Sequence, residues 1–189
     1  MSEQLLNGQQ LRKKKIITIV AAIFLVLVYT MIFRFSSENA EESSVASEAV
    51  MDFFVKLYDW FTGGDNDGSG LMGLQPVPLE SSIRKAAHFI EYMAVGFLSF
   101  GIAVLWIKKL WHSISLVLIQ LVLSGAFDEL HQYFVPGRYA SIKDVVIDTI
   151  GGMAGICIIL LVRWCRKLAS DRYLSKRTAG KRVARWWKL

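Results

Sequence analysis

Charged residues are scarce in this chain, and cysteine is scarcer still. Only 20% of the 189 residues are Asp, Glu, Lys or Arg, whereas a soluble domain carries about 25%; hydrophobic residues reach 53%. The two cysteines, Cys157 and Cys165, lie in one apolar stretch. On a helix they would stand about 12 Å apart, too far for a bridge. The composition therefore disfavours a soluble enzyme, a disordered tail and a disulfide scaffold.

Long hydrophobic runs are what the sequence has instead, and a membrane helix needs about 20 mostly apolar residues. Four segments approach or reach that length, at about 16–33, 86–107, 113–135 and 142–162. The first follows basic residues, as in a signal peptide, but its apolar run exceeds the roughly 7–15 residues of a signal core. We therefore predict an all-α fold, a polytopic membrane bundle of four transmembrane helices over 1–162, with a basic tail over 163–189.

Lysine and arginine flank these spans unequally, and cytoplasmic loops carry the excess of positive charge. The net charge is +3 before residue 16, +2 at Lys108 and Lys109, and +9 after residue 162. It is −6 over 34–107 and −2 over 113–162. The total of +6 therefore conceals a basic face and an acidic face. This partition predicts both termini in the cytoplasm, and the connection 34–85 and the turn 136–141 outside.

The long outer connection 34–85 carries a pattern of its own. Apolar residues recur there at helical spacing, which predicts an extracytoplasmic amphipathic helix over 43–61, on the outer surface or against the bundle. Residues 65–70 match the first half of a calcium loop, but Pro76 stands where Glu is needed, so we interpret them as a flexible loop. The tail 163–189 combines Trp with basic residues, which indicates membrane lipids as partners and no nucleic acid.

Ionisable residues inside the spans are the most informative feature, because a charge in a membrane is costly and marks a functional candidate. At a rise of about 1.5 Å per residue, the polar groups of three spans fall at one depth, near the outer leaflet. Gly151 and Gly155 continue the helix face of Asp144 and Asp148, and their spacing permits close helix packing. The candidate ligand-binding residues are Lys85, His88, Tyr92, Asp128, Glu129, Gln132, Arg138, Asp144 and Asp148.

Several roles stay open for this cluster. A network of ion pairs and hydrogen bonds could serve only to hold the helices together. Alternatively, His88 could act as a general base held by Asp128 or Glu129, which makes these three the catalytic candidates. No H-E-x-x-H signature is present, and no cofactor is predicted. Should a divalent metal bind, its candidate ligands are His88, Glu91, Asp128, Glu129 and His131, with Asp148 as a further carboxylate.

Five short blocks follow one another in a characteristic order. They are Phe35-Ser36-Ser37, Arg84-Lys85-x-x-His88-Phe89-x-x-Tyr92, Asp128-Glu129-x-x-Gln132, Pro136-Gly137-Arg138, and Asp144-x-x-x-Asp148 continued by Gly151-Gly152-x-x-Gly155. In these blocks the chain resembles the VanZ-like family of bacterial integral membrane proteins. It departs from the family at Asp148, where Asn is common. The long outer connection and the basic tail lie outside the pattern.

The resemblance implies a bacterial cytoplasmic membrane and, through the founding member, a link to low-level teicoplanin resistance. Glycopeptides act at the outer membrane face, on cell-wall precursors. We therefore expect an outer-leaflet pocket that binds or shields a lipid headgroup, cell-wall precursor or lipophilic glycopeptide, with Lys85 and Arg138 pairing with phosphate or carboxylate. The alternative is an intramembrane enzyme, such as a metal-dependent hydrolase or transferase, acting on a lipid-linked cell-envelope substrate. Transport is less favoured, because the polar cluster is not at the midplane; the sequence sets no oligomeric state.

Overall fold

The fold is known for two stretches of the chain. The computed structural model describes the backbone of residues 2–38 and 76–186, with a few isolated residues between them, and the side chains of 7–38 and 82–173. Most of the predicted amphipathic helix over 43–61 falls outside these described residues, and so does the whole glycine-rich loop that follows it. Both therefore stay predictions.

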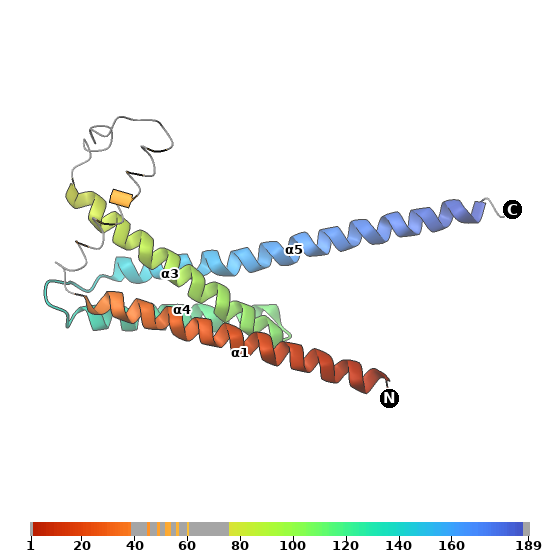
Figure 1. Cartoon of the computed structure of the whole chain (residues 1–189), viewed down its shortest axis with the longest axis horizontal. Helices are drawn as coiled ribbons and strands as arrows, with labels where there is room; N and C mark the ends of the chain where they lie inside the picture. The colour runs from red at the N-terminus through yellow and green to blue at the C-terminus, as the bar shows by residue number, and fades with distance from the viewer. Residues whose placement is uncertain are drawn as a thin grey trace.

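Four long helices make up the two described stretches 2–38 and 76–186, as Figure 1 shows. They are α1 (Ser2–Ser37), α3 (Pro76–Trp106), α4 (Leu110–Gln132) and α5 (Ile142–Trp186). Each contains a segment long and apolar enough to cross a membrane, namely Asn7–Ser37, Ser82–Trp106, Leu110–Gln132 and Ile142–Tyr173. Within 2–38 and 76–186 there is no strand. The all-α prediction of a four-helix membrane bundle is therefore confirmed.

Most helix ends differ from the predicted spans, since α1 begins at Ser2, α3 at Pro76 and α4 at Leu110. The third span was predicted to reach residue 135, but α4 ends at Gln132. Beyond it, the amides of Phe134 and Val135 donate to carbonyls only three residues back, at 3.0 Å each. Pro136 follows, and it has no amide hydrogen to donate to a helical hydrogen bond. At the other end of the bundle, α5 continues past the apolar run to Trp186, so most of the basic tail prolongs the fourth helix.

Glycines let α3 and α5 approach closely, and these two helices share the most extensive contact in the described structure. A Cβ added at Gly155 would meet the carbonyl oxygen of Met93, and one at Gly151 would meet that of Phe89. On α3, Gly96 lies equally close to the backbone of α5. The predicted role of the two α5 glycines in close packing is confirmed, and the partner helix is α3.

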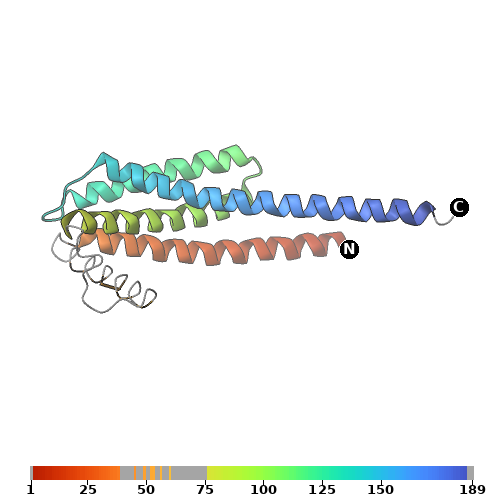
Figure 2. The ribbon, with the colours of Figure 1, turned by 90° about the horizontal axis from the view of Figure 1, so that it is seen from above.

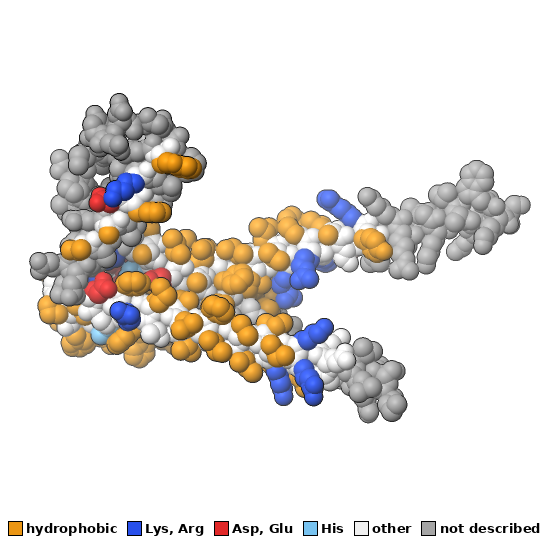
Figure 3. Space-filling view, viewed as in Figure 1, with side chains coloured by type: hydrophobic (Ala, Val, Ile, Leu, Met, Phe, Trp, Pro, Cys, Tyr) orange, Lys and Arg blue, Asp and Glu red, His pale blue; other side chains and the backbone are white. Residues whose placement is uncertain are grey.

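The exterior of the bundle is apolar along its flank, between two charged ends. Figure 3 shows hydrophobic side chains over the flank, basic side chains on the described parts of α1 and α5 toward one end, and acidic side chains near the opposite end. Figure 2 shows that the beginning of α1 and the end of α5 lie at the same end of the bundle. The interior core is small and is formed by Ile32, Tyr92, Val95, Phe100, Ala103, Val117, Leu121 and Ile156.

We expect Gly155→Ala to destabilise the bundle, because the added Cβ fits only if α3 and α5 move apart. The expected loss is about 1–3 kcal/mol of unfolding free energy, seen as a lower thermal unfolding midpoint of the purified protein in detergent. Gly101→Ala is the matched control, since its Cβ would meet only Cδ1 of Ile159, at an ordinary 3.5 Å. Alanine also has the higher helix propensity. Equal midpoints for the two variants would contradict the close contact.

Candidate functional site

Polar side chains from α3, α4 and α5 converge at the end of the bundle that carries the turn 133–141. Nδ1 of His88 lies 3.9 Å from Oε2 of Glu91, one turn along the same helix. It lies 3.8 Å from Oδ2 of Asp128 on α4 and 4.0 Å from Oδ1 of Asp148 on α5. These separations exceed hydrogen-bond length and suit ion pairing if the imidazole is protonated. The structure thus brings residues of three predicted spans to one point.

The acids of this cluster are shielded from solvent. Asp148 is only 1% exposed, and Asp128 and Glu129 are also buried. Neither carboxylate oxygen of Asp148 has a hydrogen-bond partner among the described residues, and the same holds for Nδ1 of His88. Leaving a buried charge uncompensated costs several kcal/mol. Costly polar groups of this kind are more typical of a working site than of a helix-packing interface.

A chain of hydrogen bonds ties Asp128 to the end of α1. Nε2 of Gln132 donates to Oδ2 of Asp128 at 3.0 Å and to Oγ of Ser36 at 3.3 Å. Asp128 and Gln132 meet because they stand one helical turn apart. Ser36 is fully buried, and the sequence analysis assigned it no role. Its signal was the serine pair Ser36-Ser37, which lies just beyond an apolar span.

The turn after α4 carries Arg138 back toward the helices. Gly137 has a φ of 78°, a left-handed conformation that glycine adopts without steric cost. Oε2 of Glu129 accepts a 2.6 Å hydrogen bond from the amide of Ser141 and so closes the turn. Nη2 of Arg138 donates to the carbonyl of Phe35 at 3.0 Å. The other guanidinium nitrogens, Nε and Nη1, are buried without a partner among the described residues.

A cavity of about 160 Å³ opens among these groups, and we call it the polar cavity. It is lined by Arg84, Lys85, His88, Glu129, Gln132, Gly137, Arg138, Tyr139, Asp144, Ile147 and Asp148. Nζ of Lys85 pairs with Oδ1 of Asp144 at 3.8 Å. Burial lowers the pKa of Arg138 from its ordinary value, and the positive charge of Arg84 lowers it further, although nearby acids oppose this. The guanidinium is therefore partly desolvated and faces a like charge.

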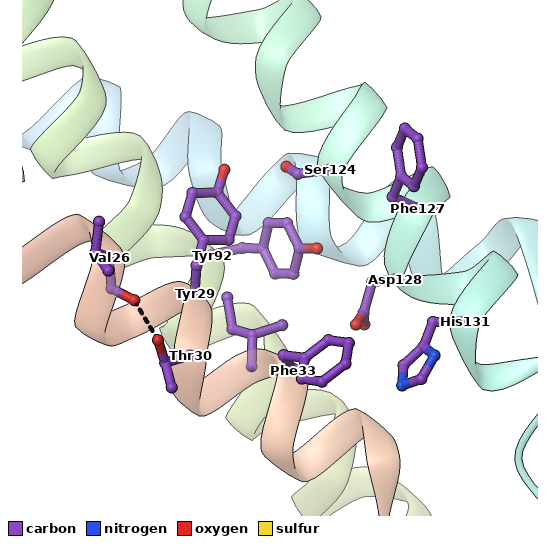
Figure 4. A pocket seen from close by; sticks show the side chains of 10 residues that line it. Val26, Tyr29, Thr30, Phe33, Tyr92, Ser124, Phe127, Asp128 and His131 are labelled. Carbon is purple, nitrogen blue, oxygen red and sulfur yellow. Dashed lines mark hydrogen bonds between the residues drawn. The ribbon is translucent and has the colours of Figure 1, made fainter.

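A larger cavity of about 670 Å³, the apolar cavity, lies between α1, α3 and α4 (Figure 4). It is lined by Val26, Tyr29, Thr30, Ile32, Phe33, Tyr92, Ser124, Phe127, Asp128 and His131. Figure 4 shows Val26 at one end of this group, and Asp128 and His131 at the other. Asp128 lines the apolar cavity while its carboxylate contacts His88, which lines the polar cavity. One polar contact therefore lies between the two cavities.

Four predicted site residues do not line the polar cavity, namely Tyr92, Glu91, Asp128 and His131. Tyr92 is 1% exposed and lines the apolar cavity instead. His131 faces α1, because its Nε2 lies 3.0 Å from Oγ of Ser37 and its ring stacks on Phe33 with 4.7 Å between centroids. Of the candidate metal ligands, His88, Asp128 and Asp148 each offer an atom within 4.8 Å of the other two. The structure does not bring His131 into that group.

Glu129→Ala should loosen the turn that holds Arg138, because it removes the carboxylate that accepts the hydrogen bond from the Ser141 amide. A hydrogen bond to a charged group contributes about 1.5–3 kcal/mol, so exchange of this amide should accelerate roughly tenfold or more. Hydrogen exchange followed by mass spectrometry measures the effect. Glu129→Gln is the control, since it keeps an acceptor without the charge. Unchanged exchange in Glu129→Ala means that the bond does not hold the turn.

A comparison with known proteins covers the residues of this site. A family model described as VanZ/LLP1 matches residues 21–163, a range that includes every charged block of the site. No curated protein and no solved structure shows significant similarity. The match is consistent with a membrane protein related to glycopeptide resistance. Because it spans most of the chain and all four apolar helices, the chain belongs to the VanZ/LLP1 family.

Proposed function

We propose that this protein binds or shields an anionic group of an amphiphile at the outer face of a bacterial cytoplasmic membrane. The amphiphile is a lipid headgroup, a cell-wall precursor or a lipophilic glycopeptide, and its capture gives tolerance to teicoplanin-type antibiotics. The observation that carries the proposal is Arg138, whose Nε and Nη1 are buried without a partner among the described residues. Those two nitrogens hold three N–H donors.

The chemistry of Arg138 selects the kind of ligand. A guanidinium presents its donors in a planar fork that matches the two oxygens of a carboxylate or phosphate. Arg138 lines the polar cavity together with Arg84 and Lys85. An anion bound there offsets the desolvation of Arg138 and the repulsion from Arg84 that together lower the pKa of Arg138. The polar cavity therefore suits one anionic group better than a cation or a neutral sugar.

Three acids near Arg138 have partners other than its guanidinium, whereas neither carboxylate oxygen of Asp148, which also lines the polar cavity, has a hydrogen-bond partner among the described residues. Asp144 pairs with Lys85, Glu129 accepts the Ser141 amide, and Asp128 accepts from Gln132. Among the described side chains, no ion pair within 4.0 Å includes Arg138. Both signs of charge can thus line one small cavity while the guanidinium keeps free donors.

The neighbouring apolar cavity supports an amphiphile over a free anion. Its aromatic and aliphatic lining, which includes Tyr29, Phe33 and Phe127, favours contact with hydrocarbon. The His88–Asp128 contact lies between the two cavities. A molecule with an anionic head and an acyl chain could thus occupy the polar cavity with its head and the apolar cavity with its chain.

A second candidate function is an intramembrane enzyme acting on a lipid-linked cell-envelope substrate. The observation that favours it is the position of His88, which lines the polar cavity and has carboxylates of Asp128 and Asp148 near Nδ1. Acids on one side of an imidazole can orient it as a general base. Turnover of an outer-leaflet lipid that is lost on His88→Ala would favour this function over binding alone.

We expect Arg138→Gln to abolish the tolerance phenotype. In a strain lacking the protein, teicoplanin susceptibility and surface binding of labelled teicoplanin should rise, and the unaltered protein should reverse both changes. Arg138→Gln should fail to reverse them, because losing charged hydrogen bonds of about 1.5–3 kcal/mol weakens binding roughly tenfold or more. Arg34→Gln is the matched control, since Arg34 is exposed near the end of α1 and does not line the polar cavity.

Two results would contradict the proposal. One is a deletion strain with unchanged susceptibility and unchanged surface binding of the labelled antibiotic. The other is an Arg138→Gln variant that is present in the membrane at the normal level and protects as well as the unaltered protein. Either result removes the outer-face anion site as the basis of function.

The proposed orientation has its own test. Because the basic end of the bundle is the cytoplasmic one by charge, green fluorescent protein fused to either terminus should fluoresce. Alkaline phosphatase inserted within 63–70, the glycine-rich part of the outer connection, should be active, since that enzyme needs export. Phosphatase fused after residue 189 serves as the inactive control. Active phosphatase at the C-terminus would reverse the assignment and place the site on the cytoplasmic side.

A further inference from the structure

We propose that His88, Asp128 and Asp148 form a binding site for a divalent transition-metal ion, where α3, α4 and α5 meet. The site uses one imidazole nitrogen and two carboxylates, each from a different helix. It extends the proposed function without depending on it, because the ligand atoms are not those of Arg138. It also supplies the compensation that the buried acids lack.

The spacing of the three side chains fits one shared ion. Each offers a ligand atom, and these atoms lie within 4.8 Å of one another. Nδ1 of His88 is 3.8 Å from Oδ2 of Asp128 and 4.0 Å from Oδ1 of Asp148. Two ligands bound to zinc at about 2.0–2.2 Å stand about 3.3–3.6 Å apart in a tetrahedron. Sub-ångström movements of the side chains therefore suffice to close the site.

Unpartnered buried atoms point independently to a ligand. The Asp148 side chain is only 2% exposed, and neither of its oxygens has a hydrogen-bond partner among the described residues. Nδ1 of His88, which lies toward both aspartates, is also buried without one. Buried carboxylates are ordinarily paired or bound to a metal. Direct hydrogen bonds within the trio are excluded by the 3.8 and 4.0 Å separations.

The local charge balance favours a dication. Asp128 and Asp148 are joined by Glu91, whose Oε2 lies 3.9 Å from Nδ1 of His88. Among the ion pairs of the described side chains, none joins Asp128 or Asp148 to a lysine or arginine, and Lys85 pairs with Asp144 instead. An ion of charge +2 bound by the trio offsets the two ligand carboxylates. An imidazole ligand favours zinc, iron or copper over magnesium and calcium, which prefer oxygen.

The surroundings hold the ligands in place. Gln132 donates to Oδ2 of Asp128 at 3.0 Å and is itself anchored on Ser36 of α1. Metal-binding carboxylates are commonly oriented by such a hydrogen bond. Asp148 stands one turn before Gly151, whose close contact with α3 fixes the distance between the two helices. The alternative to a metal ion is a protonated His88, whose imidazolium would pair with the same acids.

Metal content and thermal stability of the purified protein distinguish the two. The protein is purified without a polyhistidine tag, stripped with chelator, and dialysed against Zn²⁺ or, separately, Mg²⁺. We expect about one zinc per chain by elemental analysis and a raised thermal unfolding midpoint. Mg²⁺ should give neither. No stoichiometric zinc and no shift in the unaltered protein overturns the proposal, whatever the variants do.

Variants then locate the ion. Asp148→Asn, which is nearly isosteric, and His88→Gln should each lose the bound zinc and the zinc-dependent shift. Asp144→Asn and His131→Gln are controls at the same end of the bundle, and both should retain the metal. Zinc retained by both ligand variants overturns the site. Arg138→Gln should bind zinc normally while losing anion binding, which separates failure of this site from failure of the proposed function.

Discussion

The structure depends on one constraint: charges buried in an apolar helix bundle must be compensated from within the bundle. His88 lies within 3.8–4.0 Å of carboxylates from its own helix and from α4 and α5. The close contact of Gly151 with the backbone at Phe89 stands directly beside the pair of His88 and Asp148. The packing of α3 against α5 and the separation of His88 from Asp148 are therefore coupled. Weakening the glycine contact moves an acid away from its partner, and a buried charge is then left alone.

Two deficits remain among the residues that line the polar cavity. Arg138 retains unpaired donors, and neither carboxylate oxygen of Asp148 has a hydrogen-bond partner among the described residues. Charges of both signs coexist in part because other acids have specific partners, as Asp144 has Lys85. The proposed anion site and the proposed metal site answer these two deficits separately.

Much of the fold followed from the sequence, because a membrane imposes strong rules. Apolar runs of sufficient length are visible without tertiary information, and the four spans were predicted on that basis. The charged blocks were predicted to share one depth, since the rise of a helix is constant. His88, Asp128 and Asp148 do meet across three helices. Close packing at Gly151 and Gly155 was predictable for the same reason, because helical spacing alone puts them on the face of Asp148.

Other parts of the site could not be predicted, because they depend on where α1 packs. Periodicity put Tyr92 on the stripe of His88, yet it lines the apolar cavity beside α1. His131 looked equivalent to His88 as a metal ligand, but it stacks on Phe33 of α1. Ser36 and the Phe35 carbonyl were missed because α1 has no charge in its span to indicate an inward face. The end of α4 at Gln132 reflects local hydrogen bonds of the turn, which hydropathy does not register.

The central claim, that the outer end of the bundle holds an anionic amphiphile through Arg138, is tested most directly by native mass spectrometry. The protein is extracted from its own membrane in mild detergent, and bound molecules are identified by their mass and fragmentation. We expect a retained amphiphile bearing phosphate or carboxylate on the unaltered protein and on Arg34→Gln, and its loss from Arg138→Gln. The same occupancy in all three proteins, or none in any, would contradict it.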